Sequence, residues 1–121
     1  MTGEELYDRA VAVSERAYAP YSRFRVGAAA LARDGRVFEG VNVENAAYPL
    51  GVCAEKAALV RAVAEGYGPG DLEAIGVTAS PCGGCRQWQH EFRLERVTYR
   101  SDRGELVTAT PAGLLPDSFE L

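Results

Sequence analysis

The chain of 121 residues lacks the features of a membrane protein or of a nucleic-acid binder. No stretch approaches the roughly 20 apolar residues that a membrane-spanning helix needs. Its 17 acidic residues outnumber its 13 basic ones, which gives a formal net charge of -4, whereas a protein that binds nucleic acid polymers is expected to be basic. The acidic N-terminal residues also lack the apolar segment of a secretory signal. We therefore expect a cytoplasmic protein whose main partner is not DNA or RNA.

Several residue types are scarce, and the scarce ones gather in short segments. Three cysteines are an odd number, and a reducing compartment does not favour disulfides, so a disulfide framework is not expected. Lysine occurs once, at Lys56, and histidine once, at His90, while asparagine occurs only at Asn42 and Asn45. Short segments in which such scarce residue types gather are the places to look for a functional site.

The remaining residues predict alternating helices and strands in a single domain, residues 1–121. Thr2 and Glu5 form a capping box before a helix that Pro20 closes, and Asp34-Gly35 is a hairpin signal. The small residues 27–30 suggest that another element packs closely on the first strand. We expect a three-layer α/β/α fold around a mixed sheet of about five strands. The predicted strands are 25–32, 36–43, 72–80, 96–100 and 106–110, and two further helices are predicted over 53–66 and from 82 to about 92. The helix 53–66 is almost wholly apolar, so we expect it to be central and buried.

All three cysteines fall in two motifs, Cys53-Ala54-Glu55 and Pro81-Cys82-Gly83-Gly84-Cys85. Each motif begins a predicted helix, where free N–H groups favour a thiolate. Cys85 lies one turn after Cys82, so both sulfurs can project from the same side. Three thiolates that leave a fourth position open are typical of a catalytic zinc site, because structural zinc sites are normally closed by four ligands.

Glu55 distinguishes this site from a purely structural one. It begins an otherwise apolar helix, two positions from a proposed zinc ligand, and burying a carboxylate there is costly without a purpose. Beside a zinc-bound water, whose pKa zinc lowers towards about 7, a carboxylate can accept the water's proton and deliver it elsewhere.

These motifs resemble the zinc nucleoside deaminases, and the surrounding residues resemble the small cytidine deaminases. The resemblance covers nearly the whole chain in unbroken order. The segments that carry it, besides the two cysteine motifs with Arg86-Gln87, are Tyr21-Ser22-Arg23-Phe24-Arg25-Val26-Gly27-Ala28-Ala29, Gly40-Val41-Asn42-Val43-Glu44-Asn45-Ala46-Ala47-Tyr48 and Leu114-Leu115-Pro116-Asp117-Ser118-Phe119.

The resemblance implies a role for each matching residue. Cys53, Cys82 and Cys85 would hold one zinc ion per chain. Glu55 would carry the proton of the zinc-bound water to N3 of the pyrimidine as hydroxide attacks C4, and would then protonate the departing ammonia.

Further residues of the family pattern would bind the substrate in a homotetramer with sites at subunit contacts. Asn42 and Glu44 would bind a ribose hydroxyl, and alternation along a strand independently places them on one face. The remaining implied contacts are Phe24 flanking the nucleoside, the Ala54 N–H addressing the base carbonyl, and Tyr48 and Phe119 contributed by neighbouring chains.

The sequence departs from the family pattern after the catalytic glutamate. Arg is common there in the three-cysteine members, whereas this chain has Lys56. Three thiolates and a zinc dication sum to a charge of about -1, which a nearby cation can offset. We hypothesise that Lys56 still does so, with help from Arg86.

Other interpretations of the cysteines and of the activity stay open at this point. Cys82 and Cys85 could form a redox pair, or His90 could close a structural zinc site, although His90 falls off the face that the two cysteines share. The alternatives to cytidine and 2'-deoxycytidine as substrates are a related amino-pyrimidine nucleoside, such as a nucleoside antibiotic, or no substrate at all, as in a zinc protein used for assembly. A deaminase of polynucleotides is disfavoured because the chain is acidic overall and offers no basic track along which a nucleic acid strand could bind.

Overall fold

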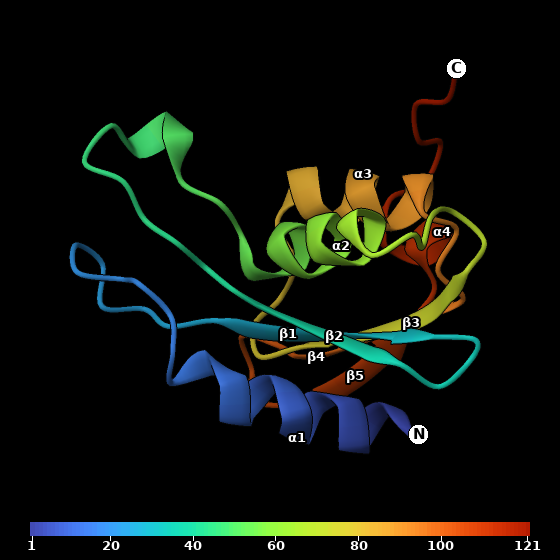
Figure 1. Cartoon of the computed structure of the whole chain (residues 1–121), viewed down its shortest axis with the longest axis horizontal. Helices are drawn as coiled ribbons and strands as arrows, with labels where there is room; N and C mark the ends of the chain where they lie inside the picture. Colours follow the sequence, from blue (N-terminus) through green and yellow to red (C-terminus); the bar gives the residue numbers. More distant parts are fainter.

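The computed structural model describes all 121 residues and arranges them in three layers around one mixed sheet (Figure 1). The strand order is β2-β1-β3-β4-β5, and only β3 and β4 pair in parallel. The sheet comprises β1 (Gly27–Ala32), β2 (Val37–Val41), β3 (Leu72–Val77), β4 (Arg96–Arg100) and β5 (Leu106–Ala109). The expected α/β/α fold with five strands is confirmed.

Helices cover both faces of the sheet. The helix α1 (Gly3–Ser14) lies on one face, and α2 (Ala54–Ala64), α3 (Gly83–Glu91) and the short α4 (Pro111–Leu114) lie on the other (Figure 1). A single 3-10 turn, η1 (Tyr48–Leu50), interrupts the long connection between β2 and α2. None of the helices is both long enough and apolar enough to cross a membrane.

The first helix begins as the capping box predicts but ends earlier than Pro20. The Thr2 hydroxyl accepts from the Glu5 N–H at 3.1 Å, and the Glu5 carboxylate accepts from the Thr2 N–H at 2.8 Å. After Ser14 the chain turns away to form a bridge, in which the Tyr18 N–H donates to the Asn42 carbonyl at 3.1 Å. The segment before Pro20 therefore extends the edge of the sheet beside Val43 instead of continuing the helix.

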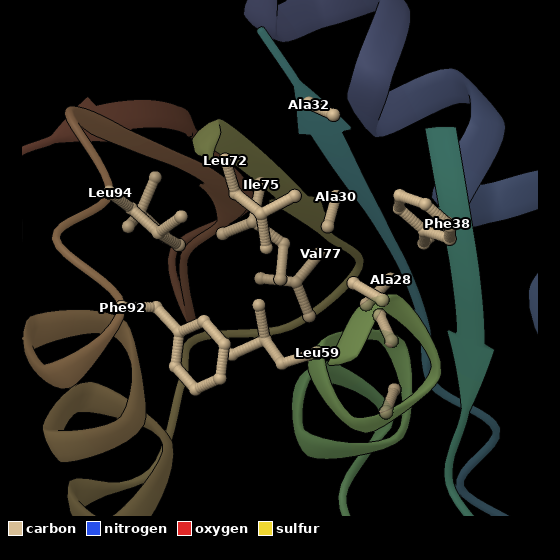
Figure 2. Packing of buried hydrophobic residues seen from close by; sticks show 14 of the residues in the cluster. Ala28, Ala30, Ala32, Phe38, Leu59, Leu72, Ile75, Val77, Phe92 and Leu94 are labelled. Atoms are coloured by element: carbon tan, nitrogen blue, oxygen red, sulfur yellow. The ribbon is translucent and has the colours of Figure 1, made fainter. Parts of the chain in front are cut away.

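The core lies on both sides of β1, whose side chains alternate between the two faces. Ala28, Ala30 and Ala32 belong to the larger cluster beneath α2, while Ala29 and Leu31 join the smaller cluster beneath α1. Figure 2 shows the larger cluster, in which the sheet meets Leu59 of α2. Small side chains on β1 thus allow a helix to approach closely on either face.

Glycines in the strands permit these close approaches. A Cβ on Gly27 would lie 2.0 Å from the Ala10 carbonyl oxygen of α1, so the small residue predicted to admit a close neighbour does so. A Cβ on Gly40 of β2 would lie 2.5 Å from the carbonyl oxygen of Ala54, the first residue of α2. The start of α2 is therefore seated directly on β2.

The helix α2 is not buried all round, which corrects the expectation drawn from its apolar sequence. Ala58, Leu59 and Ala62 are fully buried against the sheet, but Val60 and Val63 remain 51% and 50% exposed. An apolar composition does not distinguish a helix that is buried within its own chain from a helix whose outer face could be covered by another protein chain.

Candidate active site

A cavity of about 270 Å³ opens at the ends of β2 and β3, where the first turns of α2 and α3 meet. The two cysteine motifs, 29 residues apart in the chain, lie side by side in its wall. Nine of the twelve site residues expected from the sequence line it: Phe24, Asn42, Glu44, Tyr48, Cys53, Ala54, Glu55, Cys82 and Cys85. Lys56, Arg86 and Phe119 do not.

The three cysteine sulfurs converge at the helix ends. Cys53 and Cys82 are the N-cap residues of α2 and α3, and Cys85 lies in the first turn of α3. The Sγ atoms of Cys53 and Cys82 are 4.0 Å apart, and all three sulfurs lie within 4.8 Å of one another. Tetrahedral zinc with Zn–S bonds of about 2.3 Å requires sulfurs about 3.8 Å apart. Three sulfurs, with no fourth protein ligand among them, fit a zinc site with an open position.

Burial and neighbouring negative charges disfavour the thiolate form of two of the three cysteines, so a bound cation would stabilise it. Burial raises the pKa of the Cys85 thiol well above its usual range, and the negative charges of Glu55, Cys53 and Cys82 raise it further. Burial likewise raises the pKa of Cys53. At Cys82 burial acts in the same direction, but the N–H of Cys85 and further hydrogen bonds outweigh it and lower the pKa. Three mutually repelling thiolates at this spacing are the donor set that a bound dication would stabilise.

Glu55 lies in the first turn of α2 with only 4% of its surface exposed. Its burial raises the pKa of the carboxyl, although the Glu55 N–H and the Cys85 thiol act in the opposite direction. No ion pair neutralises Glu55. A buried carboxyl that lies beside a metal-ligand cluster and has no ion-pair partner is suited to proton transfer.

Asn42 and Glu44 face the same cavity, and both also hold the segment 21–26. The Asn42 side chain accepts from the Val26 N–H at 2.8 Å and donates to the Phe24 carbonyl at 2.9 Å. The Glu44 carboxylate accepts from the Tyr21 N–H at 2.9 Å and from the hydroxyl of Ser22. An amide and a carboxylate each have further hydrogen-bonding capacity, so both can also bind a ligand hydroxyl.

Comparison with known proteins decides the family. The family described as the cytidine and deoxycytidylate deaminase zinc-binding region matches residues 1–101. The chain belongs to this family. It is 42% identical to the cytidine deaminase of Halalkalibacterium halodurans, over 98% of this chain and 95% of that protein.

Solved deaminase structures have the same fold. The cytidine deaminase of Burkholderia pseudomallei superimposes with a TM-score of 0.90 at 45% identity, covering 98% of this chain and 100% of that one. The Mycobacterium tuberculosis cytidine deaminase gives a TM-score of 0.86 at 37% identity, covering 100% and 99% of the two chains. The zinc expected from the cysteine motifs is therefore the metal of the family to which the chain belongs.

Three aromatic residues expected to contact a deaminase substrate are exposed. Phe24 and Tyr48 line the cavity with 62% and 83% of their surfaces exposed, respectively. Phe119 is 69% exposed and lies outside the cavity of its own chain. The exposed faces of Phe24 and Tyr48 are open to a nucleoside or a neighbouring chain at the cavity, and that of Phe119 is open to a neighbouring chain elsewhere on the surface.

The two cations expected beside the zinc ligands have other neighbours in this deaminase. The Lys56 ammonium lies 5.6 Å from the centre of the Trp88 ring and makes no ion pair. The Arg86 guanidinium donates to the carbonyls of Pro81 at 2.9 Å and Leu114 at 3.0 Å. Neither donates a hydrogen bond to a sulfur, so any offset of the thiolate charge acts through space.

The hydroxyl of Ser22 is a site feature to which the sequence reasoning gave no role. It donates to Glu44 and accepts from the Phe24 N–H at 3.0 Å, so it links the carboxylate to the segment that presents Phe24. Ser22 belongs to the stretch that resembles the deaminases, which was the available signal. Its partner lies 22 residues away, and the strand pattern alone does not reveal that contact.

Proposed function

We propose that this chain hydrolyses cytidine and 2'-deoxycytidine to the corresponding uridine nucleosides and releases ammonia. One observation carries the proposal: Glu55, almost completely buried and without an ion pair, faces three cysteine sulfurs that lie within 4.8 Å of one another in a cavity. Membership of the deaminase family and the 42% identity to a cytidine deaminase support the same substrate class.

The zinc-binding residues would be Cys53, Cys82 and Cys85, and bound zinc acidifies a water to make a nucleophile at neutral pH. Glu55 takes the proton that this water loses and delivers it to N3 of the pyrimidine. Glu55 then takes the second proton of that water from the oxygen now bonded to C4 and transfers it to the departing amino group, so that the C4–N bond breaks and water and cytidine become uridine and ammonia. Because Glu55 is buried, its proton exchanges with the substrate instead of with bulk water.

The cavity wall provides contacts for the nucleoside. The Ala54 N–H lies at the start of α2, where backbone N–H groups have no partner within the helix, and it can donate to the carbonyl of the base. Asn42 and Glu44 bind a ribose hydroxyl, and Phe24 packs against the nucleoside. A cavity of about 270 Å³ is near the lower limit of small-molecule sites, which suits a nucleoside.

We also propose a homotetramer whose active sites are completed by neighbouring chains. Such contacts are supported by the exposure of four apolar side chains, those of Tyr48, Phe119, Val60 and Val63. Contact with another chain would remove their apolar surface from water, which is favourable. Three free cysteines that must stay reduced to bind zinc suit a reducing compartment such as the cytoplasm.

The variant Glu55→Gln tests the proposal. Removal of the proton carrier is expected to lower kcat for cytidine by at least about 10²-fold, since general acid–base catalysis contributes about 10²–10⁴-fold. Zinc content should stay at one ion per chain. Glu91→Gln, on the exposed surface of α3, is the matched control and should keep its turnover. Full activity of Glu55→Gln would refute the assignment.

A further inference from the structure

The chain after α4, residues 115–121, is held by side chains of α3. The last backbone-to-backbone hydrogen bond of the protein runs from the Leu115 N–H to the Pro111 carbonyl. Beyond it, the Gln87 side chain donates to the Phe119 carbonyl at 3.0 Å, and His90 Nε2 lies 2.8 Å from Glu120 Oε1. We call residues 115–121 the C-terminal tail, which ends at the label C in Figure 1.

Gln87 and His90 make the only hydrogen bonds to this tail beyond Leu115. The tail otherwise belongs to no helix or strand, and most of its residues are exposed. A terminal segment without backbone pairing is expected to be mobile unless something fixes it. The position of the tail therefore depends on two side chains that lie three residues apart, which places them on neighbouring positions of one helix surface.

The two contacts hold the carbonyl of Phe119 and the side chain of the next residue, Glu120, without covering the Phe119 ring. Gln87 binds the carbonyl of Phe119 itself, and His90 binds the next residue, yet the Phe119 side chain stays 69% exposed. An exposed aromatic ring on a fixed backbone loses less conformational entropy when it docks than one on a free tail.

The same helix carries two of the three sulfurs of the active site. Cys85 lies in the first turn of α3, and Gln87 and His90 follow it by two and five residues. Arg86, which directly follows Cys85, donates to the carbonyl of Leu114, the last residue of α4 before the tail, and to the carbonyl of Pro81, which directly precedes Cys82. The tail is thus attached to the element that also positions the zinc ligands.

We propose that Gln87 and His90 are positioning residues that fasten the tail so that Phe119 is presented to the active site of a neighbouring copy. The proposal rests on the proposed function, in which Phe119 completes the pocket of another subunit. Neither side chain touches the substrate. Each acts through the placement of Phe119, so its loss weakens substrate binding without changing the chemistry in a saturated site.

A double-mutant cycle tests this role. Gln87→Leu and His90→Ala should each raise KM for cytidine about 3–10-fold, the effect expected for one lost hydrogen bond, with kcat nearly unchanged. His90→Gln, which retains a donor for Glu120, should restore most of the affinity. In a Phe119→Ala background both substitutions should have no further effect on KM. Glu91→Ala, an exposed residue on the same helix, is the control.

Three results would overturn the proposal. They are KM values for Gln87→Leu and His90→Ala equal to that of Glu91→Ala, effects of full size in the Phe119→Ala background, or an unchanged KM for Phe119→Ala itself. The last result would leave the deaminase assignment standing, because that assignment fails only if Glu55→Gln retains its turnover. Hydrogen–deuterium exchange of the tail gives an independent measurement, in which faster exchange in Gln87→Leu supports the proposal and unchanged exchange contradicts it.

Discussion

The contact between Gly40 and the start of α2 predicts that a single added methyl group disturbs catalysis. In Gly40→Ala the new Cβ would lie 2.4 Å from the Ala58 nitrogen and 2.5 Å from the Ala54 carbonyl oxygen. An ordinary contact needs at least 3.4 Å, so the first turn of α2 must move by about 1 Å. Glu55 lies in that turn and moves with it.

The expected costs concern both stability and rate. Overpacking of this kind lowers the free energy of unfolding by about 1–3 kcal/mol. A misplacement of about 1 Å can cost up to about 10²-fold in rate, so we expect kcat/KM for cytidine to fall by about 10–100-fold. Chemical denaturation measures the stability, and the absorbance change on conversion of cytidine to uridine measures the rate.

Gly76→Ala is the matched control on the other face of the sheet. Its Cβ would lie 2.6 Å from the Leu6 carbonyl carbon and 2.7 Å from the Tyr7 nitrogen, so it displaces α1 and leaves α2 in place. We expect a similar loss of stability with a much smaller loss of rate, measured at a temperature where both variants are folded. Equal losses of kcat/KM in the two variants, or full activity in Gly40→Ala, would refute the reasoning.

Three further predictions concern side chains in or near the site. Gln89 is fully buried with both polar atoms unpaired, so Gln89→Leu should raise the free energy of unfolding by about 1–3 kcal/mol in urea denaturation, and a decrease would mean that the amide is satisfied in solution. Lys56→Ala should weaken zinc binding and lower turnover while Lys56→Arg retains both, and unchanged values in both variants would refute the charge-offset hypothesis. The Ser22 hydroxyl, with lesser contributions from backbone N–H groups, lowers the pKa of Glu44, so the folded carboxylate stays charged to lower pH than usual. The contribution of the charged Glu44 carboxylate to substrate binding is lost as the pH falls through its folded pKa. Removal of the hydroxyl in Ser22→Ala raises that pKa, so the rise in KM on the acid side should begin at a higher pH than in the wild type. Coincident pH profiles of the two proteins would contradict this.

Much of the site could be predicted from the sequence because its geometry is local. A cysteine at the start of a helix and another three residues later have sulfurs on one side whatever the rest of the fold does, and Cys82 and Cys85 confirm this. The hairpin at Asp34-Gly35 and the cap at Thr2 depend on equally short-range interactions and were also confirmed.

Features that depend on distant residues could not be predicted in the same way. The apolar sequence of α2 did not reveal that Val60 and Val63 face outward, because hydrophobicity alone does not identify the covering surface. The Arg86 side chain has several rotatable bonds, so the sequence does not specify its hydrogen-bond partners. Its hydrogen bond to the Leu114 carbonyl depends on where α4 packs. The first helix ends at Ser14 because Tyr18 pairs with an edge of the sheet 24 residues further on, which no local pattern specifies.

The most direct test of the central claim measures zinc and cytidine turnover in the same preparation. The protein should contain one zinc ion per chain, lose cytidine deamination when a chelator removes the zinc, and recover it when zinc is returned. A metal-free preparation that still converts cytidine to uridine at the full rate would rule out a catalytic role for zinc.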